Sequence, residues 1–133
     1  MKSIEKRIRE NNRVLKFKRH VDFPTLEENY LNTAIELHLS LREQWSHRLL
    51  EEPNNPICLF NRGVETYTIG DNDYWAIEDF TRVIELLPSA EKAYYLRACL
   101  RKQMGDEIGS QQDFDTAFRL NPSVNETIGW GGW

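Results

Sequence analysis

Few residues in this chain could do chemistry, and their spacing does not assemble a catalytic or metal site. The three histidines, His20, His38 and His47, have no ligand spacing with one another, and none stands beside a cysteine. Cys58 and Cys99 have neither zinc-ligand nor redox spacing, and buried free thiols are favoured over a disulfide between them. We therefore expect no bound metal and no cofactor.

The remaining catalytic signatures are also missing from the sequence. It contains no phosphate-binding loop, no nucleophile motif and no paired carboxylates in an apolar setting. The acidic clusters at residues 51–52, at Asp71 and Asp73, and at Asp113 and Asp115 are typical of helix caps and solvated helix faces. The sequence therefore argues against an enzyme.

The charge distribution is the first indication of binding. The whole chain has a net charge of -4, yet residues 1–20 hold eight basic side chains against two glutamates. A basic arm on an acidic body suggests RNA, an anionic membrane surface or an acidic partner. The alternative is a solvated arm that folds back on the acidic body. The basic residues are Lys2, Lys6, Arg7, Arg9, Arg13, Lys16, Lys18 and Arg19.

Length and composition describe a small globular chain. With 133 residues, 40% of them hydrophobic, it can bury a single core. No apolar run approaches the roughly 18 residues of a membrane span, and no hydrophobic signal segment follows the first basic residues. A cytoplasmic location is expected.

From residue 53 onward the sequence repeats itself. PNNPICLFNRG is followed 35 residues later by PSAEKAYYLRA, and AIEDFTRVIELLP is followed 34 residues later by SQQDFDTAFRLNP. A period of this length is typical of a helix-turn-helix solenoid unit. Such a unit cannot bury its apolar face alone, so successive units are expected to stack.

Start and stop signals divide each copy into two helices. In the first copy a helix is predicted over about residues 57–69, ending at Gly70. Asp71 or Asp73 can cap the second helix, which carries an apolar stripe and stops before Pro88.

The second copy shows the same signals. Ser89 can cap a helix of about 13 residues that ends near Gly105. Asp106 can cap the last helix, which stops before Pro122.

Over residues 53–122 the chain resembles the tetratricopeptide repeat family. The family pattern is an aromatic, then Leu-Gly, Tyr, Ala, Phe, Ala and Pro at set intervals. Arginine stands here in place of the leucine, and threonine or arginine in place of the tyrosine. The matching positions are Leu59, Arg62, Gly63, Thr66, Ala76, Phe80, Val83 and Pro88, and then Tyr94, Arg97, Ala98, Arg101, Ser110, Phe114, Ala117 and Pro122.

The resemblance implies an all-α fold, a short helix-turn-helix solenoid with units at residues 54–88 and 89–122. The small residues are expected where paired helices approach closely, with Gly63 facing Ala76 and Ala98 facing Ser110.

Residues 21–53 are expected to be a divergent helical segment after the basic arm. Thr25 and Glu28 suit a capping box, and apolar residues then recur at helical spacing up to Glu52. Against this, residues 35–41 alternate between apolar and polar, which is typical of a strand. Pro53 stands nine residues before Arg62, as Pro88 stands before Arg97. The segment is therefore one long helix or a degenerate helical hairpin, and the sequence does not decide.

The resemblance also implies a binding site. In this family the first helix of each unit lines a concave groove that binds segments of other proteins. The corresponding residues, which lie three and four apart on one helical face, are Ile57, Phe60, Val64, Tyr67, Lys92, Tyr95, Cys99 and Lys102.

The side chains at these sites indicate what the groove would accept. Co-chaperones of the family grip a carboxylate with lysine, asparagine and arginine, whereas Phe60, Val64, Tyr95 and Cys99 favour an apolar peptide or an amphipathic helix. The alternative is that residues 57, 60 and 64 pack against residues 26–52 and leave no open groove.

The C-terminal residues 123–133 end in TIGWGGW, which is too short and too rich in glycine for a convincing helix. Solenoids need a polar cap after the last unit, so Phe118 and its neighbours are expected to lack a cover. Trp130 and Trp133 could cover that face in the same chain, dock into another copy's groove in a homodimer, or present themselves to a different protein. A tail that contributes nothing is the fourth alternative.

The sequence thus favours a non-enzymatic adaptor, assembly factor or co-chaperone-like module that binds an apolar peptide or helix. The alternative is an RNA- or membrane-associated protein that acts through its basic arm. A third hypothesis is a purely structural subunit of a larger complex.

Overall fold

The computed structural model describes residues 24–128, with side chains from residue 29 onward, and every regular element among them is an α-helix. The prediction of an all-α fold is confirmed over this range. The helices are α3 (Pro24–Glu51), α4 (Pro56–Ile69), α5 (Asp73–Leu86), α6 (Glu91–Gln103), α7 (Glu107–Leu120) and the single turn α8 (Val124–Thr127).

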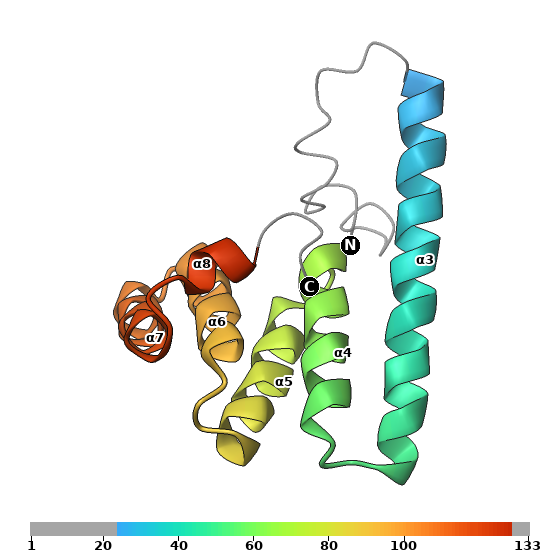
Figure 1. Ribbon diagram of the computed structural model, residues 1–133. Helices are drawn as coiled ribbons and strands as arrows, with labels where there is room; N and C mark the ends of the chain where they lie inside the picture. Colours follow the sequence, from blue (N-terminus) through green and yellow to red (C-terminus); the bar gives the residue numbers. More distant parts are fainter. Residues whose placement is uncertain (1–23, 129–133) are drawn as a thin grey trace.

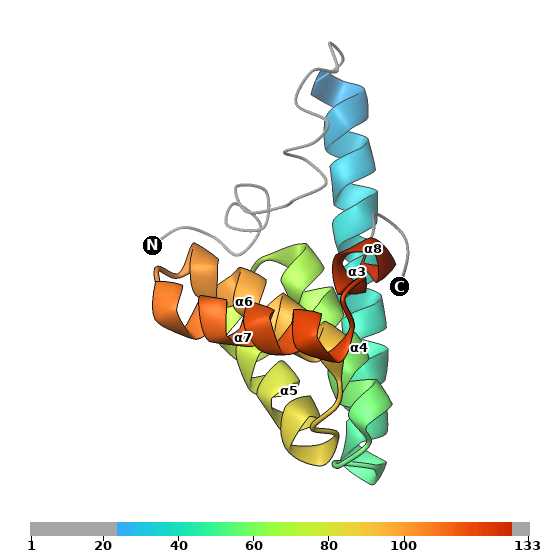
Figure 2. The ribbon, with the colours of Figure 1, turned by 60° about the vertical axis from the view of Figure 1, so that its left-hand side comes forward.

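The helices pack in chain order. Each of the helices α3 to α6 lies against the next one, and α8 returns to contact α6 (Figures 1 and 2). The segment that the sequence left undecided is one continuous helix, α3, so the alternating pattern at residues 35–41 does not form a strand. In both views α3 extends beyond the end of α4. Within the described residues, none of the helices combines the length and apolar character that a membrane span needs.

The hairpin of α4 and α5 begins and ends on local side-chain signals. Asn55 caps α4 by accepting hydrogen bonds from the amides of Ile57 at 3.0 Å and Cys58 at 3.2 Å. The helix ends at Gly70 with a φ of 75°, the left-handed conformation that glycine adopts without steric cost. Asn72, not Asp71 or Asp73, caps α5 by accepting from the amide of Trp75. An amide oxygen is as good a cap as a carboxylate, so the choice among three adjacent residues depended on loop geometry.

The hairpin of α6 and α7 follows the predicted bounds with one correction. Ser89 does not cap α6, because the helix starts after Ala90 without a side-chain cap. Asp106 caps α7 as predicted, accepting from the amide of Gly109 at 2.9 Å. The proposed capping box at residues 25 and 28 involves side chains outside the described part.

The core runs through both hairpins and reaches α3. Its buried members come from α3 to α6 and are Leu49, Cys58, Leu59, Val64, Ala76, Phe80, Val83, Ala93, Leu96 and Leu100. We call this set the main core cluster. Both cysteines are free; Cys58 is buried, whereas Cys99 is only partly so.

Gly63 allows α4 to approach α5 closely, but its neighbour differs from the predicted one. A Cβ atom at Gly63 would lie 2.8 Å from Cε1 of Phe80 and 3.1 Å from its Cζ. The fully buried Phe80 ring, not Ala76, therefore fills the space that the glycine leaves. In the second hairpin Ser110 does meet Ala98, since its hydroxyl donates a 2.9 Å hydrogen bond to the Ala98 carbonyl.

Candidate functional site

The four groove positions predicted on α4 divide into exposed and buried ones. Ile57 is 67% exposed, whereas Val64 is 6% exposed and belongs to the main core cluster. Phe60 and Tyr67 lie between these extremes and pack against the same cluster. The Phe60 ring also contacts that of Phe80, with centroids 5.8 Å apart. Val64 is therefore a core residue that lies beneath the more exposed predicted groove positions of α4.

The positions on α6 are more accessible. Lys92, Tyr95 and Cys99 are partly exposed, and Lys102 is exposed. Tyr95 is held by two edge-on ring contacts to α7, at 5.2 Å from Phe114 and 6.0 Å from Phe118. Burial raises the pKa of the Tyr95 hydroxyl above its ordinary value, and the nearby Cys99 adds to the rise. The side chain therefore stays neutral under ordinary conditions.

These apolar and basic positions lie on the first helices of the two hairpins, α4 and α6, and we call them together the α4–α6 face. Its partly or fully exposed members are Ile57, Phe60, Tyr67, Lys92, Tyr95, Cys99 and Lys102.

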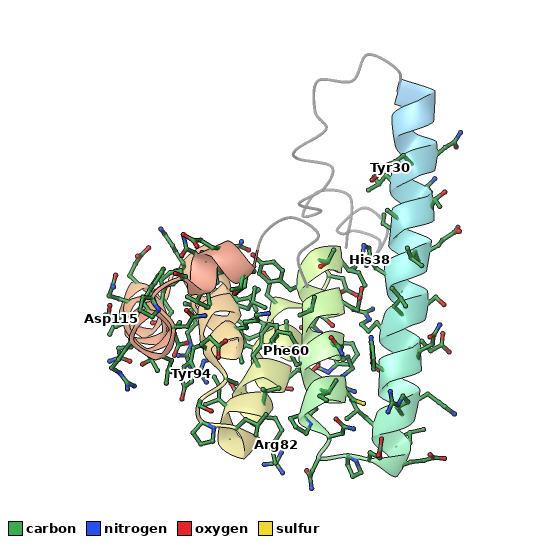
Figure 3. The ribbon with its side chains drawn as sticks, in the orientation of Figure 1. Tyr30, His38, Phe60, Arg82, Tyr94 and Asp115 are labelled. Carbon is green, nitrogen blue, oxygen red and sulfur yellow. The ribbon has the colours of Figure 1, made fainter. Side chains whose placement is uncertain are left out.

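The helix α3 also packs against α4, and its Leu49 belongs to the same core cluster as Val64. The Nδ1 atom of His38 lies 2.6 Å from an Oε atom of Glu65, in the space between the two helices (Figure 3). Glu65 follows Val64, which places it about 100° further around the helix. The alternative in which residues 57, 60 and 64 pack against residues 26–52 does not hold for Ile57, which is 67% exposed, whereas Phe60 and Val64 share the main core cluster with Leu49 of α3.

Arginine–aspartate pairs that the sequence analysis missed join the paired helices. Arg62 on α4 donates to Asp79 on α5, from Nε at 2.9 Å and from Nη2 at 2.8 Å. Arg97 on α6 donates in the same bidentate way to Asp113 on α7, with both bonds at 2.8 Å. Arg101 adds a third 2.8 Å hydrogen bond to Asp113.

These pairs correct two interpretations. From the sequence, Arg62 and Arg97 were interpreted only as departures from the family pattern. Asp113 was interpreted as a solvated or capping residue. Asp113 is instead buried, at 4% exposure. The repeat itself held the signal, because an arginine recurs after 35 residues and an aspartate after 34.

Burial and charge act in opposite directions on Asp79. Desolvation raises the pKa of this carboxyl above its ordinary value of 3.8, and Glu78 adds to the rise, while the hydrogen bond and charge of Arg62 lower it. The effect of burial on the pKa is larger than that of Arg62. Ionising Asp79 therefore costs more free energy in the folded protein than in the unfolded chain.

A related cluster ties α3 to the first hairpin. Arg42 donates two hydrogen bonds to Asp71, at 2.7 and 2.9 Å. Its guanidinium carbon also lies 5.1 Å from the ring centroid of Trp75, which the guanidinium of Arg62 approaches to 5.0 Å. Asp71 therefore fixes α3 against the α4–α5 turn instead of capping a helix.

The described chain continues past the last repeat with a short turn, and Phe118 stays exposed. Residues after Pro122 form the turn α8, whose Val124 is fully buried, and Ile128 packs against the main core cluster. Phe118 is 38% exposed, but most neighbouring exposed side chains on α7, such as Asp115 on the outer side in Figure 3, are polar. Trp130 and Trp133 lie outside the described residues.

The other candidates for chemistry are histidine, cysteine and acidic side chains. Among residues 29–128, no group of three or more histidine, cysteine, aspartate or glutamate side chains could hold a metal ion. The basic-arm residues and His20 fall outside the described part, so their predicted role stays a prediction.

Comparison with models of protein families and with curated proteins finds no match to this chain. The α4–α6 face is thus interpreted from its own geometry.

Proposed function

We propose that this protein is a non-enzymatic interaction module, a short solenoid of two tetratricopeptide-like units behind the long helix α3. The repeated ion pair supports the solenoid, since Arg62 with Asp79 and Arg97 with Asp113 join the two helices of successive hairpins in the same way. The packing of each helix on the next one in the chain also agrees with stacked units.

The binding site in this proposal is the α4–α6 face, and its ligand is an amphipathic helix or apolar peptide of another protein. The observation that carries it is the placement of three partly exposed aromatic side chains, Phe60, Tyr67 and Tyr95, on the first helices of the two hairpins. Aromatic rings are the usual anchors of protein interfaces. Lys92 and Lys102 lie on α6 with Tyr95, so acidic residues flanking the apolar stripe would complete the ligand. An adaptor or assembly role follows.

The test is a selection from displayed helical peptides that carry an apolar stripe and acidic flanks, followed by affinity measurements on the full chain. Phe60→Ala and Lys102→Glu should each lower the affinity for a selected peptide, and Phe60→Ala should lower it by at least about tenfold. Lys102 is exposed, so its reversal should not disturb folding, whereas Phe60→Ala must be checked by thermal melting. Tyr74→Ala is the matched control, because Tyr74 is a 73% exposed aromatic residue on α5.

Two other outcomes point away from this face. If Tyr74→Ala weakened peptide binding as much as Phe60→Ala does, the peptide would be binding exposed aromatic rings without specificity. Binding that ignores both face variants, falls steeply with salt and disappears when residues 1–20 are deleted would favour the basic arm and an RNA or anionic membrane ligand.

A further inference from the structure

The helix α3 carries apolar side chains on two opposite sides. Ile35 is buried in a small cluster that includes a residue of α4, and Leu39 packs against the same cluster. Leu37 and Leu41 each stand two residues further along, which is about 200° around the helix, so they lie on the far side from that cluster. Leu37 is accordingly 55% exposed. The alternating pattern at residues 35–41 therefore comes from one helix with two apolar sides.

The outer apolar positions form a stripe along α3. Tyr30 is 49% exposed and lies on the part of the helix that extends beyond α4 (Figure 3). Ala34, Leu37 and Leu41 follow at intervals of four, three and four residues, which is the spacing along the seam of a coiled coil. Ala34 and Leu41 are partly exposed. We call these four residues the α3 stripe. An apolar stripe of this kind is the side by which a helix packs against a neighbour.

The α3 stripe is complementary to a second copy of itself when the two helices run antiparallel. A two-fold axis beside residue 39 places Leu37 of each copy opposite Leu41 of the other. The same axis places Tyr30 opposite Arg48, whose side chain is 57% exposed and can approach the ring as a cation. The next position along the stripe, residue 51, is a glutamate, so the apolar seam ends there.

The charges of α3 agree with pairing between identical helices. Thr33 and Ser40 on the flank of the α3 stripe, and Gln44 at the position after Leu41, carry no charge. Glu36 and Glu43 lie about 100° or more around the helix from every member of the stripe. Like charges that face each other across an interface cost several kcal/mol, so this placement removes a barrier to self-association.

We propose that two copies of this protein associate through the α3 stripe, with the two helices antiparallel and Leu37 of each copy packed against Leu41 of the other. The α4–α6 face lies on other helices, so the dimer carries two of the proposed peptide sites. A partner with two suitable segments then binds more tightly than one with a single segment. That consequence rests on the proposed function, whereas the dimer does not.

The test is sedimentation equilibrium of the full chain over a wide concentration series. The wild type should move from the mass of one chain to that of two as the concentration rises. Leu37→Glu should stay a monomer, because it places a charge at the centre of the seam. Leu50→Glu is the matched control, since Leu50 is a 78% exposed leucine on the same helix but outside the α3 stripe. It should dimerise like the wild type, and thermal melting checks that both variants fold.

Nitroxide labels and pulsed EPR test the antiparallel arrangement. Position 40 lies beside the two-fold axis, whereas position 33 is six residues from it. The two labels of a dimer should therefore lie about 18 Å apart along the helix axis at position 33 and only about 3 Å apart at position 40. The labels are attached to Thr33→Cys and Ser40→Cys in separate Cys99→Ser chains, in which the remaining Cys58 is buried.

Three results overturn the proposal. A wild type that remains a monomer at every concentration would show that the α3 stripe does not self-associate. A dimer that survives Leu37→Glu, or that Leu50→Glu weakens equally, would form through another surface. Equal label distances at positions 33 and 40 would indicate parallel helices. Tyr30→Ser should also weaken the dimer, so the test stands even if Leu37→Glu folds poorly.

The dimer and the proposed function can fail separately. Leu37 lies on α3, so Leu37→Glu should leave the affinity for a single selected peptide unchanged. A dimer without any peptide binding would keep the association and refute the proposed function. A monomer that binds the peptide through the α4–α6 face would refute the association and keep the function.

Discussion

The close approach of α4 and α5 at Gly63 leads to a prediction that separates steric packing from helix propensity. Gly63→Ala introduces a Cβ atom 2.8 Å from Cε1 of Phe80, closer than such atoms come in real structures. The ring is fully buried and part of the main core cluster, so it cannot move aside freely. Overpacking of this kind costs about 1–3 kcal/mol, while replacing glycine by alanine inside a helix returns roughly 0.5–1 kcal/mol. The net loss is therefore between about 0 and 2.5 kcal/mol.

A double-mutant cycle with Phe80→Leu isolates the steric part. Leucine removes the ring atoms nearest to position 63, so the alanine should be tolerated much better in the Phe80→Leu background than in the wild type. We expect a coupling free energy of roughly 1 kcal/mol or more, measured by urea unfolding. Ala98→Gly is the matched control at the same place in the second hairpin, and it should only destabilise. Additive effects, or a Gly63→Ala variant more stable than the wild type, would refute the proposed packing.

Two further predictions concern the buried aspartates. Asp113→Ala leaves Arg97 and Arg101 without their shared carboxylate and should lower the free energy of unfolding in urea by about 3 kcal/mol. The control Asp115→Ala, on the exposed side of α7, should change it by no more than about 0.5 kcal/mol. Similar losses of stability in the two variants would show that the ion pair is unimportant. Because the pKa of Asp79 is raised, its contribution to stability is fully present below pH 3.8 and is lost as the pH rises through the folded-state value. The wild type should therefore gain stability relative to Asp79→Asn as the pH falls through that window, and a gain in the opposite direction would mean that Arg62 outweighs burial.

Local sequence signals predicted most of the helix boundaries. Gly70 ends α4 and Asp106 caps α7 because these effects depend on one residue and its immediate neighbours. The exact cap of α5 was missed, since Asp71, Asn72 and Asp73 all have suitable side chains and only the turn geometry selects Asn72. Whether residues 21–53 form one helix or a helical hairpin was undecided because Pro53 stands where a preceding repeat unit would end; the structure has the single helix α3.

Contacts between helices were harder to predict than the helices. Arg62 and Arg97 do not fit the apolar family position, so they were read as departures when each in fact pairs with an aspartate some 16 or 17 residues later. A charged residue that recurs at the repeat period together with an opposite charge was the available signal. No comparable signal defines the tail, because two tryptophans among glycines suit several apolar surfaces equally well.

The most direct test of the α4–α6 face is NMR mapping of a selected amphipathic peptide on the ¹⁵N-labelled full chain. We expect the amide shift changes to concentrate on α4 around Phe60 and Tyr67 and on α6 around Tyr95, with little change in the outer part of α7. Shifts confined to residues 1–20, or to the part of α3 that extends beyond α4, would contradict it.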